Sequence, residues 1–183
     1  MKRTLPFAIL LLLLLMISVG CNNGNANSNP LDVQIPDDFN FSLCFGIEGM
    51  NDIDTYSDTF TKDLISDGTE TISFSIPDEK MKEIYQVFLK NKIAELPDDI
   101  NAYALETIGD TASSHTPADY YSLTFTLNGI TKTIVCNDGG PWDAKKGPPN
   151  ERKQLVQFVE FIREYIFSTE EYQNMSPSVG GYA

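Results

Sequence analysis

The sequence predicts an α+β fold in which a five-stranded, mainly antiparallel sheet is covered on one face by two helices. Three observations predict it. Several stretches alternate apolar and polar residues with a period of two, which is typical of half-buried strands. Two other stretches repeat apolar residues at helical spacing, and an Asn128-Gly129 pair between alternating runs indicates a tight hairpin. Together they give the order β-β-β-α-β-β-α.

Three strands are predicted in the first part of the folded region. Residues 39–48 alternate strictly between apolar and polar side chains, and residues 49–54 form the turn that follows. Residues 55–62 combine threonines with aromatic residues, and residues 71–76 alternate again after an Asp67-Gly68 turn signal. Short turns between these strands predict an antiparallel meander.

Two helices are predicted to cover the sheet. The first begins at Pro77, since proline is tolerated in a first turn, and the second begins at Asn150. Each carries one apolar stripe, which we interpret as core: Met81, Ile84, Tyr85 and Phe88 in the first; Leu155, Phe158, Val159, Ile162 and Ile166 in the second.

The Asn-Gly turn also predicts the register of the second hairpin. It sets Tyr121 opposite Cys136 on the apolar face, whereas Cys44 lies on the polar face of its own strand. A disulfide needs its Cβ atoms about 4 Å apart, so no bond is expected between these two cysteines unless a bulge reverses one of them. The same register places Lys132 opposite Phe125, where its ammonium group must reach the edge of the sheet.

The N-terminal residues predict export. Lys2 and Arg3 precede eleven apolar residues at 7–17, a run too short to span a bilayer, which takes about 20. The small residues before Cys21 resemble the lipobox of bacterial lipoproteins. This resemblance implies that Cys21 is diacylated and becomes the mature N-terminus. The alternatives are an ordinary cleaved signal peptide and an uncleaved anchor.

The domain organisation follows from that resemblance. Residues 1–20 are expected to be a lipoprotein signal peptide, 21–36 a flexible, asparagine-rich tether and 37–183 a single α+β domain. With the Gly180-Gly181-Tyr182 ending, this organisation is similar to that of small lipoproteins of bacterial envelopes, a resemblance that implies no activity. The expected location is extracytoplasmic and lipid-anchored, on the cell membrane or the outer membrane.

The charge of the chain excludes some partners. Removal of Lys2 and Arg3 with the leader leaves 11 basic and 26 acidic residues, a net charge of −15. Such a surface repels phosphate backbones and anionic headgroups, so we expect no nucleic-acid partner and no basic membrane-binding face. The expected membrane contact is the lipid anchor alone.

Few residues of the sequence indicate a ligand-binding or metal-binding site. The sequence has one histidine, His115, in the aperiodic stretch 97–119, and one tryptophan, Trp142, in the turn-rich stretch 137–150. Both are candidate ligand-binding residues, although surface and core roles are the alternatives. Asp52, Asp54 and Asp58 resemble the start of a calcium loop but lack its glycine and closing glutamate, and turn formation explains them equally.

These observations favour a binding module over an enzyme. No catalytic residue and no cofactor are predicted, because the sequence has no zinc motif and no phosphate loop, and its one imidazole, His115, lies in the aperiodic stretch, where pairing with Cys136 or a serine is the alternative. We expect a non-catalytic protein that interacts with an envelope protein or a small ligand. The alternatives are an envelope hydrolase that uses carboxylates of the 97–119 or 137–150 stretch, and an inhibitor of a secreted enzyme.

Overall fold

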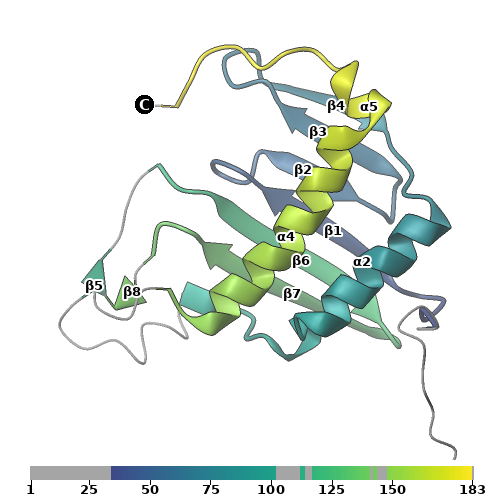
Figure 1. The fold of residues 1–183 in the computed structure, drawn as a ribbon. Coiled ribbons are helices and arrows are strands. Elements are labelled where there is room, and N and C mark those ends of the chain that lie inside the picture. Colours follow the sequence, from purple (N-terminus) through teal and green to yellow (C-terminus); the bar gives the residue numbers. More distant parts are fainter. Residues whose placement is uncertain (1–33, 102–111, 114–116, 141, 144–147, 183) are drawn as a thin grey trace, which may run out of the picture. The chain divides into compact units, whose positions relative to one another are not determined.

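The computed structural model describes residues 34–101, 112–113, 117–140, 142–143 and 148–182, with the backbone alone at 112–113 and 142–143. These residues belong to one compact unit, Val33–Ala183. Its fold is α+β with an antiparallel main sheet, as predicted (Figure 1).

The main sheet has six strands, so the prediction of five was wrong by one. Their order is β4-β3-β2-β1-β6-β7, and every neighbouring pair is antiparallel. The strands are β1 (Asn40–Phe45), β2 (Asn51–Asp54), β3 (Thr59–Asp63), β4 (Thr69–Ser73), β6 (Tyr120–Leu127) and β7 (Ile130–Asn137).

The strand that the sequence did not indicate is β2. It occupies the predicted turn at 49–54, and the following turn at 55–58 takes the place of the first half of the next predicted strand. Ile53 is fully buried, and β2 pairs with β1 on one side and β3 on the other. Tertiary pairing on both sides therefore makes a strand of a segment whose composition favours a turn.

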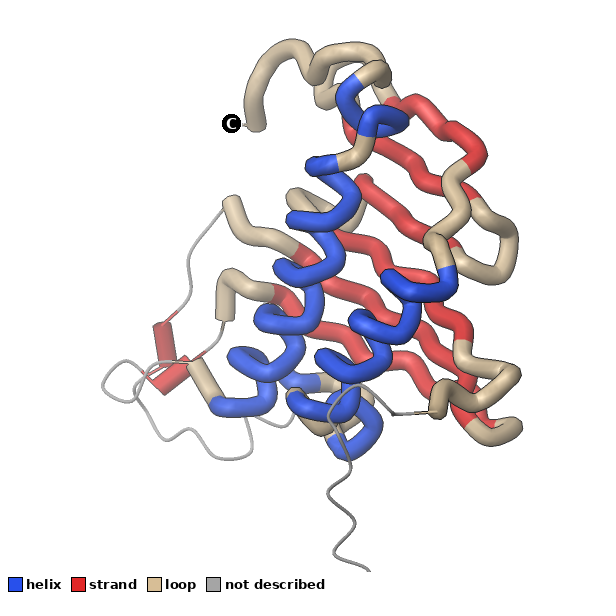
Figure 2. Tube along the Cα trace, turned by 45° about the vertical axis from the view of Figure 1, so that its right-hand side comes forward, coloured by secondary structure: helices blue, strands red, loops and turns tan. Residues whose placement is uncertain are grey.

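The two long helices cover the same face of the sheet, as predicted (Figures 1 and 2). They are α2 (Asp78–Lys90) and α4 (Asn150–Ser168), and they are accompanied by the 3₁₀ turn η1 (Ile93–Glu95) and the short α5 (Glu170–Gln173). Phe88 of α2 joins the layers, because its ring centroid lies 4.9 Å from that of Phe125 on the sheet and 5.7 Å from that of Phe158 on α4.

The register of the β6–β7 hairpin is the predicted one. Tyr121 pairs with Cys136 and Phe125 with Lys132. The Lys132 ammonium group reaches the edge of the sheet, where it donates to the carbonyl oxygens of Ala94 and Leu96 around η1. Burying the stem of a lysine while its charged end reaches main-chain oxygens accounts for its place on the apolar face.

A second, two-stranded sheet joins the two stretches that the sequence marked as loops. β5 (Ala112–Ser113) pairs antiparallel with β8 (Trp142–Asp143), so the 97–119 and 137–150 stretches meet at these four residues. Figure 1 shows this small sheet beyond the end of β7.

Both ends of the described chain are held by the fold. Ile35, inside the predicted tether, is partly buried against the core, so the folded region begins before residue 37. The C-terminal segment pairs in parallel through Val179 with Ile65, and the Val179 amide donates to the carbonyl of Leu64 at 3.1 Å. Tyr182 donates to the Asp63 carboxylate.

Candidate binding face

The face of the sheet opposite the helices is the candidate functional surface. Along each strand, alternate side chains point into the apolar core, and those between them are half-buried or exposed. The outward positions carry mostly hydroxyl groups, since the strands are rich in serine and threonine. The helices of the described residues pack on the other side, so no helix covers these hydroxyls.

Strand pairing aligns these outward side chains into rows that run across the whole sheet. The first row, from β4 to β7, is Ser73, Thr59, Asp54, Ser42, Thr124 and Thr133. The second row, in the same order, is Thr71, Thr61, Asp52, Cys44, Ser122 and Val135. We call this surface the hydroxyl face.

Hydrogen bonds between cross-strand neighbours hold the hydroxyls of the face in place. Thr124 and Thr133 lie 2.8 Å apart, and Thr61 and Thr71 also lie 2.8 Å apart, in each case between their Oγ1 atoms. Each hydroxyl has one proton and two acceptor sites, so a single bond to a neighbour leaves capacity for a ligand. The rows therefore present a fixed array of groups that can both donate and accept.

A tyrosine flanks these rows on either side, along the direction of β6. Tyr56, in the turn after β2, is 48% exposed, and its hydroxyl contacts Thr126 Oγ1 at 2.8 Å and the Asn40 carbonyl at 3.2 Å. Tyr120 begins β6, and a Cβ added at Gly49 would stand 3.0 Å from its ring. The Tyr56 ring is thus anchored across β1 and β6, and the Tyr120 ring lies against the Gly49 backbone.

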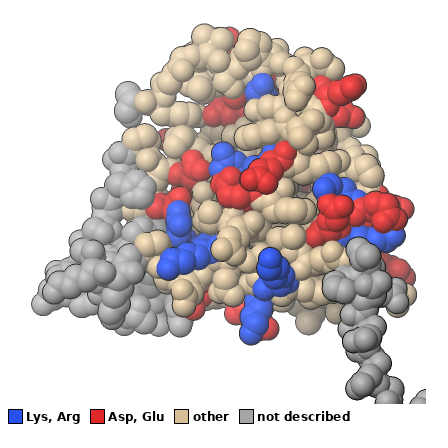
Figure 3. Space-filling view, in the orientation of Figure 1, with Lys and Arg blue, Asp and Glu red and all other residues tan. Residues whose placement is uncertain are grey.

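Charged side chains are almost absent from the hydroxyl face. The six described strands contain two lysines, Lys62 and Lys132, and both alternate with the inward, apolar set. Asp52 and Asp54 are the carboxylates in the two rows. By contrast, lysines and carboxylates gather over the helix side, where Lys82 pairs with Glu79 at 2.6 Å (Figure 3).

The two carboxylates of the face are already engaged. Asp52 accepts from Ser42 Oγ at 3.2 Å and from the Cys44 thiol at 3.5 Å. Asp54 accepts from the Tyr56 amide, and from the Ser57 hydroxyl, both at 2.8 Å. The Asp54 contacts close the β2–β3 turn, and the Asp52 contacts link β2 to β1.

The three carboxylates of the predicted calcium site lie in β2 and in the turn that follows it. Asp58 lies in the turn with a positive φ of 53°, and Asp52 and Asp54 belong to a strand, not to a calcium loop. Within the part of the chain that the structure describes, no group of three or more histidine, cysteine, aspartate or glutamate side chains is placed to hold a metal.

The other predicted site residues fall largely outside the described part. His115 and Cys21 lie outside the described residues. The backbone of Trp142 is described in β8, opposite Ser113, and its side chain is not. The sequence alone did not indicate this pairing of the Trp142 and Ser113 backbones.

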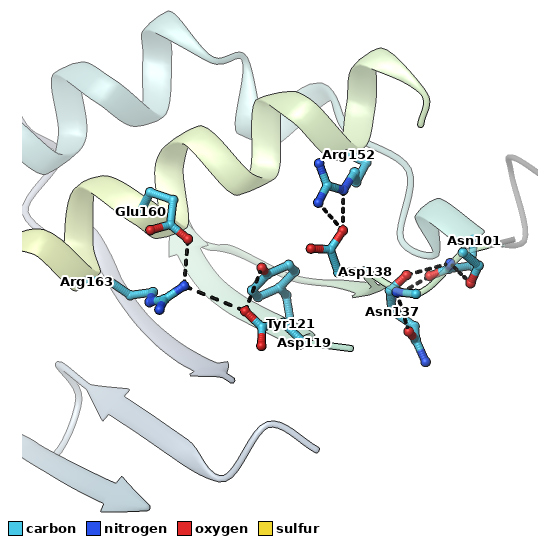
Figure 4. A network of polar contacts seen from close by, with 10 residues as sticks. Asn101, Asp119, Tyr121, Asn137, Asp138, Arg152, Glu160 and Arg163 are labelled. Atoms are coloured by element: carbon cyan, nitrogen blue, oxygen red, sulfur yellow. Dashed lines mark hydrogen bonds and ion pairs between the residues drawn. The ribbon is translucent and has the colours of Figure 1, made fainter. Parts of the chain in front are cut away.

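Carboxylates of the two predicted loops form ion pairs with arginines of α4 (Figure 4). Asp138 pairs with Arg152 near the start of α4. Asp119 lies 3.6 Å from Arg163 of α4 and accepts from the Tyr121 hydroxyl at 3.2 Å. Burial, with Asp119 nearby, raises the pKa of that hydroxyl, so Tyr121 stays a neutral donor. These ion pairs fix α4 against the start of β6 and the end of β7.

Cys44 and Cys136 are free, as their opposed faces predicted. Cys136 is fully buried on the helix side, and burial raises its pKa to about 12. Cys44 lies on the hydroxyl face, where partial burial and the neighbouring Asp52 raise its pKa to about 11. Thiols with such values stay protonated at neutral pH and are poor nucleophiles.

The sequence contained a signal for the hydroxyl face. The serine and threonine positions form the polar half of the alternating strands. Their alignment into rows depends on strand order, which the sequence did not give.

Comparison with models of protein families gave no match, and comparison with curated proteins gave none either. In the described part of the chain, no helix combines the length and the apolar character needed to cross a bilayer.

Proposed function

We propose that this protein is a non-catalytic binding module, held outside the cytoplasm by a lipid on Cys21 and presenting its hydroxyl face to an envelope component. The leader and the asparagine-rich stretch support the anchoring. The observation that carries the binding role is the hydroxyl face itself: two aligned rows of mostly polar side chains across six strands, with a tyrosine on either side of the rows.

The described reactive groups support binding over catalysis. The two free thiols have raised pKa values, and the loop carboxylates Asp98, Asp119 and Asp138 each pair with a lysine or an arginine. A hydrolase needs a carboxylate free to exchange protons with substrate. The hydrolase alternative therefore gains no support from these residues.

Labelled palmitate tests the anchor. We expect the wild-type chain to incorporate the label and to fractionate with membranes, and Cys21→Ser to incorporate none. Cys44→Ser is the matched control, since it makes the same substitution at a position without an expected lipid, and it should keep both properties. Label in Cys21→Ser, or none in the wild-type chain, would contradict the proposed anchor.

Thiol labelling in intact cells tests whether the hydroxyl face is occupied. Thr133→Cys places a thiol at an exposed position of the face, and Gln157→Cys places one at an exposed position of α4. Both variants are made in the Cys44→Ser background. We expect Thr133→Cys to be labelled more slowly in cells than after purification, and Gln157→Cys to be labelled equally in both. Equal labelling of both variants in cells and after purification would refute the role of this face.

A further inference from the structure

We propose that the ligand of the hydroxyl face is an uncharged polysaccharide. This inference rests on the proposed function and names the class of ligand that the same surface would take. Three features carry it: the charge of the face, the regular spacing of its hydroxyls, and the two tyrosines that flank the hydroxyl rows.

The net charge of the chain and the charge of the hydroxyl face both disfavour ionic ligands. The mature chain carries a net charge of −15, and no arginine or lysine points outward from the six described strands. A polyanion would therefore find no cation on this face. A polycation would have to compete with the internal donors that already bind Asp52 and Asp54. An uncharged ligand meets neither obstacle.

The spacing of the hydroxyls suits a repeating chain of sugars. Neighbouring strands lie about 4.8 Å apart, so a row across six strands presents hydrogen-bonding groups over about 24 Å. Each sugar residue also carries hydroxyls that donate and accept, and successive residues repeat them. Many weak contacts in register add to a useful affinity, because each later contact is made at high effective concentration.

The tyrosines supply apolar surface for the faces of sugar rings. The Tyr56 hydroxyl is held by Thr126, which lies six positions along β6 from Tyr120, a distance of about 20 Å in a strand. Since hydrogen bonds or backbone contacts fix both rings, little side-chain entropy is lost when a ligand stacks on them. The two rings therefore lie at opposite edges of the face along the strand direction, at right angles to the rows, and each offers a surface on which a sugar ring can stack.

Co-sedimentation tests the ligand class. The full chain, extracted from membranes in a non-ionic detergent, is mixed with insoluble chitin, with cellulose, or with carboxymethylated cellulose as the anionic counterpart. We expect saturable binding to at least one of the two uncharged polymers and weaker binding to the anionic one. Tyr56→Ala should weaken that binding about tenfold through loss of the stacking surface. Leu89→Ala, which truncates an exposed side chain on α2, should leave it unchanged.

A pair of charge variants keeps the test independent of Tyr56. Thr133→Lys adds a cation to the hydroxyl face and should reduce binding, whereas Gln157→Lys adds the same cation to α4 and should not. Equal binding by Thr133→Lys and Gln157→Lys, or a preference for carboxymethylated cellulose, would overturn the proposal.

The cellular labelling experiment separates the two proposals. Protection of Thr133→Cys in cells, without binding to either uncharged polymer, would overturn the polysaccharide and leave the binding module standing. Protection accompanied by crosslinks between two copies of the chain would likewise replace the polysaccharide with a second copy. Absence of both protection and binding would overturn both proposals.

Discussion

A single glycine holds the C-terminal segment against the β3–β4 turn. Gly180 has a φ of +101°, and a Cβ there would collide with Ser66 Oγ. We expect Gly180→Ala to lower the free energy of unfolding by roughly 1–2 kcal/mol, because both the backbone and the contact oppose it. Urea denaturation measures the loss, and faster amide exchange at Ser66 and Val179 would locate it.

The neighbouring glycine provides the control. A Cβ at Gly181 has no atom within 4 Å, so Gly181→Ala should leave both the stability and the exchange unchanged. Equal effects of the two substitutions would show that the segment is not held by the Gly180 conformation.

The positions of single residues could be predicted from the sequence where neighbouring residues determined them. The position of Lys132 followed from the Asn-Gly turn, and the need for its ammonium group to reach an edge was predicted. The carbonyl oxygens of Ala94 and Leu96 accept hydrogen bonds from this ammonium group. These acceptors could not be predicted, because they belong to another element. The same limit applies to Tyr56, whose partner Thr126 is 70 residues away.

Among the elements, α2 depends most on Phe88, which is 1% exposed and packs against rings of the sheet and of α4. Phe88→Ala should cost about 3–5 kcal/mol through the lost burial and the cavity left behind. Leu89→Ala on the same helix, 43% exposed, should change stability by less than about 0.5 kcal/mol. Urea denaturation of both variants checks this contrast, which a Phe88→Ala cost near that of Leu89→Ala would contradict.

Elements with a strong period were predictable, and β2 was not. Both helices and the β6–β7 hairpin carry their pattern in their own residues. In β2 only Ile53 is apolar, and its aspartates are typical of turns, which also made them resemble a calcium loop. Pairing with β1 and β3 makes this segment a strand, although its own residues favour a turn. A rule based on local sequence could therefore not have predicted β2.

For the whole molecule, the fully buried Cys136 reports on unfolding. Because its folded pKa is raised to about 12 from the ordinary 9.0, the protonated thiol favours the folded state below pH 9. This stabilisation should decline as the pH rises from 9 to 12. At pH 8 and in the Cys44→Ser background, labelling of Cys136 with a thiol reagent should follow the loss of circular dichroism across a urea titration.

Coincident transitions would show that the core opens as one unit. Labelling of Cys136 well before the loss of circular dichroism would instead show that the β6–β7 hairpin opens separately.

The candidate face emerges only at the scale of the whole molecule. Each strand showed its polar side in the sequence, but the order β4-β3-β2-β1-β6-β7 decides which hydroxyls become neighbours. Ser42 and Thr124, adjacent in one row, are 82 residues apart in the chain. Long-range pairing of this kind leaves no trace in local periodicity.

The central position of β1 also determines when the main sheet can close. As the first described strand, β1 needs β6 as its second neighbour, and β6 begins at Tyr120. Until β6 and α4 have been synthesised, one edge of β1 stays open and the apolar face of the sheet is not covered by α4. Folding of the sheet therefore depends on the last third of the chain and cannot be completed while that part is still being made.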